Sequence, residues 1–249
     1  MKRLVFALLT TSLMMSASAQ NGILGKVNKK LGKDSTKLQQ VISVKPGNGS
    51  LSNEEVIRGL KEALSIGTDS STKRLNNLNG FFANAAIKIL MPQEAKKVET
   101  TLRNLGMSAL VDKAVLSMNR AAEDAAGNVN AIFWDAIKQM SLQDGWNILR
   151  GGDFAATEYL KKNTTKALTD KIRPVIQASL EKVNATAYWK DVFSTYNKFS
   201  RQQVNTDLTA YVTGKALDGL FYEIGLEEQK IRKDPAAQVT DLLKKVFGK

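Results

Sequence analysis

Two serine–lysine pairs have the spacing Ser-x-x-Lys, which can place a serine nucleophile beside a lysine base for acyl transfer. They are Ser70 with Lys73 and Ser179 with Lys182. The pattern is short, and a lysine-rich helical chain produces it by chance. Neither companion motif of the penicilloyl-serine enzymes is present. We therefore predict no catalytic residue from either pair.

Carboxylate pairs could instead supply the general acid and base of a glycosidase-like cleft. Adjacent residues on a helix point in different directions, so solvated faces, helix caps and ion pairs such as Glu123 with Arg120 are the favoured interpretation. Asp144 and Asp153 both lie where a helix is predicted to start. The pairs considered are Glu123 with Asp124, Asp144 with Asp153, and Glu227 with Glu228.

Five large aromatic residues could line a ligand pocket between helices, because such pockets are mostly apolar. Aromatic residues at helical spacing more often belong to the core, and we favour that interpretation. The five residues are Trp134, Trp146, Tyr159, Tyr188 and Trp189.

The chain contains no histidine and no cysteine. These absences remove the commonest general base, the thiol nucleophile and the usual zinc and haem ligands. They also exclude disulfides and the cysteine-linked lipid anchor of bacterial lipoproteins. The sequence has no P-loop, dinucleotide-binding fingerprint or calcium-binding loop. We predict no catalytic, cofactor-binding or metal-binding residue, and we favour a protein that is not an enzyme.

The first nineteen residues have the pattern of an export signal. Lys2 and Arg3 precede an apolar run over residues 5–15, and small residues around Ala19 form a cleavage site. The apolar run is too short and too interrupted to serve as a transmembrane anchor. We predict cleavage after Ala19 and a periplasmic or secreted mature protein.

Residues 20–50 form a basic segment rich in Gly, Ser and Asn, a composition that folds poorly by itself. We predict a flexible arm that acts as a solvated tether, and the alternative is a tail that binds acidic surfaces. Export makes genomic DNA an unexpected partner. The lysines that would make such contacts are Lys26, Lys29, Lys30, Lys33 and Lys37.

Residues 51–249 have an apolar residue every three to four positions almost throughout, which predicts a compact all-α domain. Ser52 and Glu55 form a capping box for a first helix that should end near Gly67. Residues 85–91, just before Pro92, are the one place where a short strand or extended link competes with helix.

The clearest periodicity covers residues 108–126, and Leu116 on its opposite side indicates a second packed face. Pro174 should bend one of the later helices. Other helices are predicted over 92–105, 132–140, 141–151, from Asp153 onward, over 164–183, 188–199 and 207–224, and after Asp234 and Pro235.

A set of sequence blocks runs in order from Met118 to the end of the chain. The blocks are Met118-Asn119-Arg120-Ala121-Ala122-Glu123, Met140-Ser141-x-x-Asp144, Ile148-Leu149, Ala155-Ala156-Thr157-x-Tyr159-Leu160, Tyr211-Val212-Thr213-x-Lys215-Ala216-Leu217-Asp218-Gly219-Leu220-Phe221, Ile231-Arg232, Pro235-Ala236-Ala237 and Lys244-Lys245-Val246-Phe247-Gly248. Together they resemble the bacterial family called domain of unknown function 4197, over roughly residue 51 to the C-terminus. The resemblance implies an exported helical protein of Gram-negative bacteria. It implies no activity and no functional residue.

The leading hypothesis from the sequence is a non-enzymatic periplasmic helical protein that binds a protein partner or an envelope component. One alternative is an enzyme that works through carboxylates, hydroxyls or lysine. The other alternative is a binder of acidic surfaces, such as lipopolysaccharide or anionic lipid, through the basic arm. The first alternative requires a cleft in which Glu123, Asp144 or a Ser-Lys pair meets other polar groups.

Overall fold

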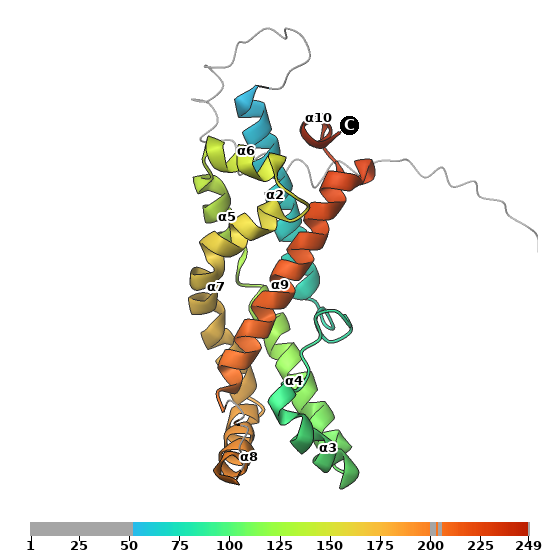
Figure 1. Cartoon of the computed structure of the whole chain (residues 1–249), viewed down its shortest axis with the longest axis vertical. Coiled ribbons are helices and arrows are strands. Elements are labelled where there is room, and N and C mark those ends of the chain that lie inside the picture. The colour runs from blue at the N-terminus through green and yellow to red at the C-terminus, as the bar shows by residue number, and fades with distance from the viewer. Residues whose placement is uncertain (1–51, 200–202, 204–205, 249) are drawn as a thin grey trace, which may run out of the picture. The chain divides into compact units, whose positions relative to one another are not determined.

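The computed structural model describes residues 52–199, 203 and 206–248 (Figure 1). The predicted leader and basic arm lie outside the described residues. Within the described ranges every regular element is a helix and no strand occurs, so the predicted all-α fold is confirmed. The helices are α2 (Asn53–Leu75), η1 (Gln93–Ala95), α3 (Lys96–Asn104), α4 (Ser108–Ala126), α5 (Asn130–Gln139), α6 (Leu142–Arg150), α7 (Ala155–Glu181), α8 (Ala185–Phe199), α9 (Leu208–Lys233), η2 (Pro235–Ala237) and α10 (Asp241–Phe247).

The first described helix, α2, begins at the predicted capping box but ends later than predicted. The Ser52 hydroxyl accepts the Glu55 N–H at 3.1 Å, and the Glu55 carboxylate accepts the Ser52 N–H at 3.0 Å. The helix then continues through Gly67 to Leu75, so the predicted end near Gly67 is wrong. Gly67 is buried against α9, where an added Cβ would lie 3.6 Å from Cβ of Glu227. Tertiary packing thus outweighs the cost of about 1 kcal/mol for glycine within a helix.

Residues 76–92 connect α2 to η1 without a regular element of their own, apart from turns. Residues 88–92, before η1, have neither helix nor turn, which agrees with the predicted extended link. Pro92 lies at the N-cap of η1 with extended backbone angles, so the helical backbone starts just after it. This irregular segment is held by α4 and α9.

The long helices α2, α4, α7 and α9 form the core of the unit. The most extensive packing joins α7 with α9, α4 with α7, and α2 with α9. Helix α9 therefore lies at the centre, and Figure 1 shows it running diagonally through the middle of the helices. The predicted helix over 108–126 is confirmed with both of its ends as α4. Its buried residues include Val111, Met118 and Ala122.

Helix α7 is one helix of 27 residues, where the sequence suggested two, and Pro174 lies inside it. The prediction that Asp153 caps this segment is wrong. The N-cap is Phe154, which makes no side-chain capping bond, and the Asp153 carboxylate pairs with Lys233 instead. A residue distant in sequence supplies the missing cap, as described below.

The C-terminal prediction is correct only in part. Asp234 accepts the Ala236 N–H at 2.9 Å and Pro235 follows it, as expected for a helix start. These residues start the short η2 and not the final helix. The final helix, α10, has its own cap, because the Thr240 hydroxyl accepts the Leu243 N–H at 3.2 Å.

Candidate functional site

Asn119 and Glu123 of α4 hold the irregular segment 76–92 in place. The Asn119 amide bonds to both backbone groups of Ile89, accepting its N–H at 2.9 Å and donating to its carbonyl at 2.8 Å. One oxygen of Glu123 accepts the N–H groups of Phe81 and Phe82, each at 3.1 Å. Arg120 pairs with the other Glu123 oxygen. These buried polar groups are fully used in fixing the backbone, which indicates a structural role.

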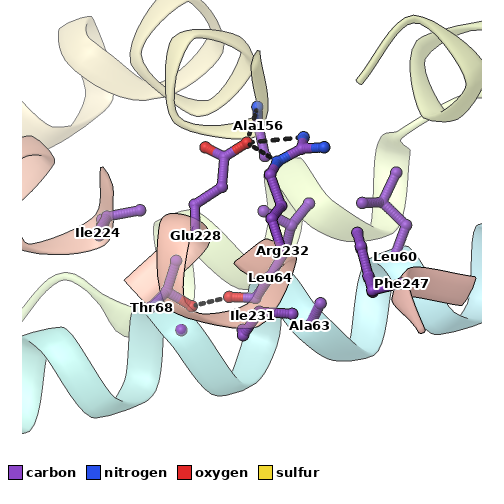
Figure 2. A pocket seen from close by; sticks show the side chains of 11 residues that line it. Leu60, Ala63, Leu64, Thr68, Ala156, Ile224, Glu228, Ile231, Arg232 and Phe247 are labelled. Carbon is purple, nitrogen blue, oxygen red and sulfur yellow. Dashed lines mark hydrogen bonds and ion pairs between the residues drawn. The ribbon is translucent and has the colours of Figure 1, made fainter. Parts of the chain in front are cut away.

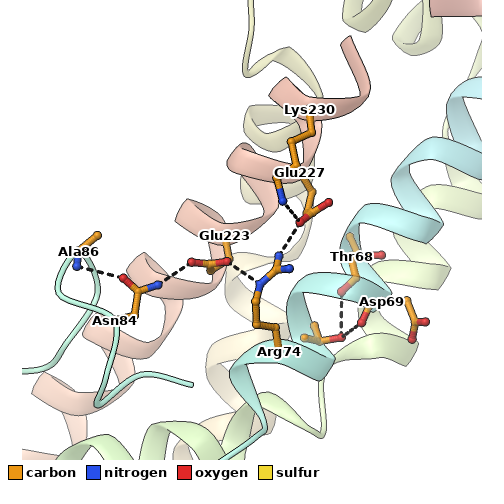
Figure 3. Close-up of polar contacts among 9 residues, drawn as sticks. Thr68, Asp69, Arg74, Asn84, Ala86, Glu223, Glu227 and Lys230 are labelled. Atoms are coloured by element: carbon orange, nitrogen blue, oxygen red, sulfur yellow. Dashed lines mark hydrogen bonds and ion pairs between the residues drawn. The ribbon is translucent and has the colours of Figure 1, made fainter. Parts of the chain in front are cut away.

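A second polar network joins α2, α9 and the same segment (Figure 3). Arg74 donates to Glu223 at 3.0 Å and to Glu227 at 2.6 Å, and Asn84 donates to Glu223 at 2.8 Å. Although burial opposes ionisation, hydrogen bonds from Lys230 and Arg74 keep the pKa of Glu227 below its ordinary value. Arg74, Asn84 and both glutamates are thus all engaged in bonds within the protein, which indicates a structural role.

A third network joins α9 to the start of α7 and lies beside a small pocket (Figure 2). Glu228 accepts the backbone N–H groups of Ala156 and Thr157 at 2.9 and 2.8 Å, so it caps α7 from a distance. Arg232 donates to Glu228 at 2.8 Å and to the Ile148 carbonyl at 2.9 Å. The pocket has a volume of about 20 Å³, close to the space that one water molecule needs, about 10–15 Å³. This pocket is too small for an organic ligand.

A far larger cleft lies between two pairs of elements: α3 with α4 on one side, and the end of α7 with α8 on the other. Its volume is about 590 Å³, within the range of about 300–1,000 Å³ that is typical of ligand pockets. Most of the lining is apolar. The lining residues that concern us are Leu102, Leu110, Leu116, Met118, Val183, Tyr188, Trp189 and Phe193, together with Lys113, Arg120, Asp124, Ser179 and Lys182. This cleft is the candidate functional site.

Polar groups from α4 and α7 meet in the wall of the cleft. The Ser179 hydroxyl donates to the Asp124 carboxylate at 2.7 Å. The ammonium groups of Lys113 and Lys182 have neither an ion pair nor a hydrogen bond within the described part of the chain. The cleft therefore combines apolar surface with two uncompensated positive charges.

The two Ser-x-x-Lys pairs have different surroundings. Lys73 pairs with Asp69 at 2.6 Å, and neither Ser70 nor Lys73 lines the cleft. Ser179 and Lys182 both line the cleft, but the Ser179 hydroxyl is bonded to Asp124 and not to Lys182. Only the second pair thus lies in a cavity that could admit a ligand.

The carboxylate pairs do not form acid/base sites. Glu123 is buried against residues 81–82, whereas its neighbour Asp124 lines the cleft. Asp144 closes a capping box with Ser141. The Ser141 hydroxyl and backbone N–H both donate hydrogen bonds to the Asp144 carboxylate, and these bonds lower the pKa of Asp144. Glu227 and Glu228 belong to two different networks. The expected ion pair of Glu123 with Arg120 is present, although Glu123 is buried and not solvated.

The five aromatic candidates divide among surface, core and cleft: Tyr159 packs against the core, and Trp189 belongs to the core and also lines the cleft. Trp134 is 42% exposed beneath Lys138, and Trp146 lies beneath Arg150. Tyr159 donates to the Ala136 carbonyl at 3.4 Å. Trp189 and Tyr188 line the cleft, and Trp189 contacts the Phe193 ring with centroids 4.5 Å apart.

A signal for the cleft is present in the sequence of α4. Lys113, Ser117, Arg120 and Asp124 recur every three or four residues, which places them along one edge of α4 beside its apolar stripe. Leu116, noted as the start of a second packed face, also lines the cleft. Within the described ranges, no helix has the length and apolarity needed to cross a bilayer. The carboxylates there do not gather in a group of three or more that could hold a metal ion.

Residues 50–248 match a family that is described as protein of unknown function (DUF4197). The match confirms the resemblance carried by the sequence blocks and covers the whole helical unit. No curated protein and no solved structure matches the chain. The chemistry of the cleft is therefore the available guide to what the protein does.

Proposed function

The chain belongs to the DUF4197 family of proteins of unknown function, and we propose that it is an exported, non-enzymatic protein that binds an apolar component of the bacterial envelope. The binding site is the cleft between α3–α4 and α7–α8. The observation that carries this proposal is the volume of that cleft, about 590 Å³, and its largely apolar lining.

The cleft leaves apolar side chains in contact with water. Leu110 is 48% exposed, Val183 is 55% exposed and Tyr188 is 64% exposed, and all three line the cleft. Each square ångström of apolar surface that a ligand covers contributes about 25 cal/mol to binding. An apolar ligand would therefore gain favourable free energy from side chains that the fold itself does not bury.

Binding of a ligand is tested by analysis of what the purified protein retains. The protein is denatured, extracted with organic solvent, and the extract is examined by mass spectrometry. Ala114→Trp places an indole in the cleft and should abolish retention of the ligand. Ala109→Trp, on an exposed position of the same helix outside the cleft, should retain it. Equal recovery from both variants, with circular dichroism showing both folded, would refute the cleft as the site.

Export is supported by the pattern of residues 1–19. A C-terminally tagged protein should be recovered from the periplasmic fraction, and its N-terminal sequence should begin at Gln20. Recovery of the uncleaved chain from the cytosol would overturn this part of the proposal.

A second candidate function, ester hydrolysis, has one specific observation in its favour. Ser179 lies in the cleft wall with its hydroxyl bonded to Asp124, three residues before Lys182. Lys182 does not contact that hydroxyl, so the described geometry does not provide the lysine base that the Ser-Lys mechanism requires. Hydrolysis of p-nitrophenyl esters by the purified protein, lost in Ser179→Ala while ligand binding persists, would establish this function instead.

A further inference from the structure

The face of α4 that lines the cleft is divided lengthwise into an apolar half and a polar half. Val111, Met118 and Ala121 on the apolar half are buried or nearly so and form the floor. Lys113 and Asp124 lie on the polar half, about 40–60° further round the helix from the nearest apolar lining residue at 100° per residue. A ligand that fits this surface has a long apolar part and a polar part at one edge.

The charge at that edge is positive. Lys113 comes from α4 and Lys182 from the C-terminal end of α7, so the two ammonium groups belong to opposite walls of the cleft. Arg120 is already paired with Glu123, and the Asp124 carboxylate is engaged by Ser179. Two free positive charges therefore face one bonded carboxylate. Without Lys2 and Arg3 of the predicted leader, the net charge is 34 − 24 = +10, which also attracts anions.

We propose that the cleft binds a single-chain anionic amphiphile, with its acyl chain against Met118 and Trp189 and its carboxylate or phosphate between Lys113 and Lys182. This inference rests on the proposed function, because it names the class of ligand for the same site. An anionic headgroup would form ion pairs with the ammonium groups of Lys113 and Lys182. The acyl chain would cover the exposed side chains of Leu110, Val183 and Tyr188 at the rim of the cleft.

The position of the acyl chain is tested by fluorescence quenching. Trp189 lies in the cleft, and the other two tryptophans of the chain can be replaced in a Trp134→Phe/Trp146→Phe background. Bromine-labelled dodecanoate, used below its micellar concentration, should quench the remaining emission. In a series of unlabelled fatty acids competing with it, the dissociation constant should fall by up to about fourfold per added methylene, from about 0.8 kcal/mol per methylene.

The headgroup is tested with ligands of one chain length: dodecanoate, dodecyl phosphate, dodecanol and dodecyltrimethylammonium. The two anions should bind at least about tenfold more tightly than the alcohol, the difference expected for a hydrogen-bonded charge. Lys113→Gln/Lys182→Gln should remove that preference. Lys161→Gln/Lys171→Gln changes the net charge equally at exposed positions outside the cleft and should keep it.

The outcomes separate this inference from the function on which it rests. If dodecanol binds as tightly as the two anions and quenching persists, the cleft binds apolar molecules but the anionic headgroup is wrong. If bromine-labelled dodecanoate does not quench Trp189, while an amphipathic peptide helix that carries a bromine label does, the amphiphile is wrong and a protein partner replaces it. If nothing binds, both proposals fail. A preference for phosphate over carboxylate points to lysophospholipids, and the reverse points to free fatty acids; either result supports the inference.

Discussion

Removal of the Glu228 carboxylate would test whether α9 holds the start of α7. In Glu228→Ala, the N–H groups of Ala156 and Thr157 lose their acceptor, and so does the Arg232 guanidinium. The two charged side chains are largely buried, with exposed fractions of 6% for Glu228 and 12% for Arg232. Water therefore cannot easily replace the missing carboxylate.

The expected loss of stability follows from these contacts. Removal of one partner of a buried ion pair costs about 3–5 kcal/mol, because the other charge stays buried without compensation. Each buried N–H left without an acceptor costs about 1–3 kcal/mol. These costs overlap, because relaxation around a single cavity relieves them together, so we expect a total of about 4 kcal/mol. For a chain of this size the unfolding midpoint should fall by about 8–16 °C.

Urea unfolding followed by circular dichroism at pH 7 measures this loss. Asp153→Ala is the control, because its ion pair with Lys233 is exposed and should contribute at most about 1 kcal/mol. The double variant Glu228→Leu/Arg232→Leu should lose less stability than the two single leucine variants together, since it leaves no unpaired charge. A Glu228→Ala protein that unfolds within about 1 kcal/mol of the unmodified chain would refute the reasoning.

Three further predictions concern stability. Gly219→Ala should destabilise by about 1–3 kcal/mol, because the new Cβ would lie 2.5 Å from the Phe81 ring. Gly214→Ala on the same helix should stabilise by about 0.5–1 kcal/mol, because its new Cβ would meet no atom of the other described elements within 4 Å; urea unfolding compares the two variants. Ser71→Ala should leave the unfolding midpoint unchanged or raise it in a thermal melt, because the buried Ser71 hydroxyl has no hydrogen-bond partner among the described residues. The pKa of Asp144 is lowered by hydrogen bonds from the Ser141 hydroxyl and N–H at the start of its helix. The stabilisation that the Asp144 carboxylate gives to the folded state is therefore present above the unfolded-state pKa of about 3.9, and it is lost as the pH falls through the lower folded-state pKa. Thermal melts should therefore show Asp144→Asn less stable than the unmodified chain at pH 7 and equal to it at pH 2.

Features that depend on near neighbours in the sequence were predictable. The capping boxes at Ser52 and Ser141 use residues three positions apart, and a helix starts at each of them as predicted. The helix over 108–126 was predicted with both ends, because its apolar stripe is a local signal. The all-α class follows from the same periodicity repeated along the chain.

Features that depend on distant residues were not predictable in the same way. Gly67 normally favours a helix end, but the residues that follow it are packed against distant elements, and Leu75 is fully buried, so α2 continues to Leu75. Asp153 was the best local cap for α7, but the capping group is Glu228, which is 72 residues from Ala156. No periodicity in the sequence reports on a cap supplied by another helix.

The cleft was predictable only in fragments. Trp189 and Tyr188 were considered as pocket residues, and Leu116 was assigned to a second packed face, but no sequence pattern showed that they lie together. The cleft requires α3 with α4 and α7 with α8 to be held apart at a fixed distance. That distance depends on the core around α9 and on the long-range bond between Ser179 and Asp124, which are 55 residues apart.

The sequence blocks that carry the resemblance contain residues that hold the fold, whereas the two unpaired lysines of the cleft lie outside these blocks. Asn119, Glu123 and Arg232 lie in those blocks, and each holds a backbone segment or caps a helix. Lys113 and Lys182, which supply the free charges of the cleft, lie outside the blocks. A buried polar clamp tolerates few substitutions, because a partner left unpaired costs several kcal/mol, about 3–5, whereas a lysine at the rim of a cleft can be replaced at little cost to folding. Two chains that share the clamps can therefore share this fold and still differ in what the cleft binds, so the ligand has to be inferred from each chain's own rim.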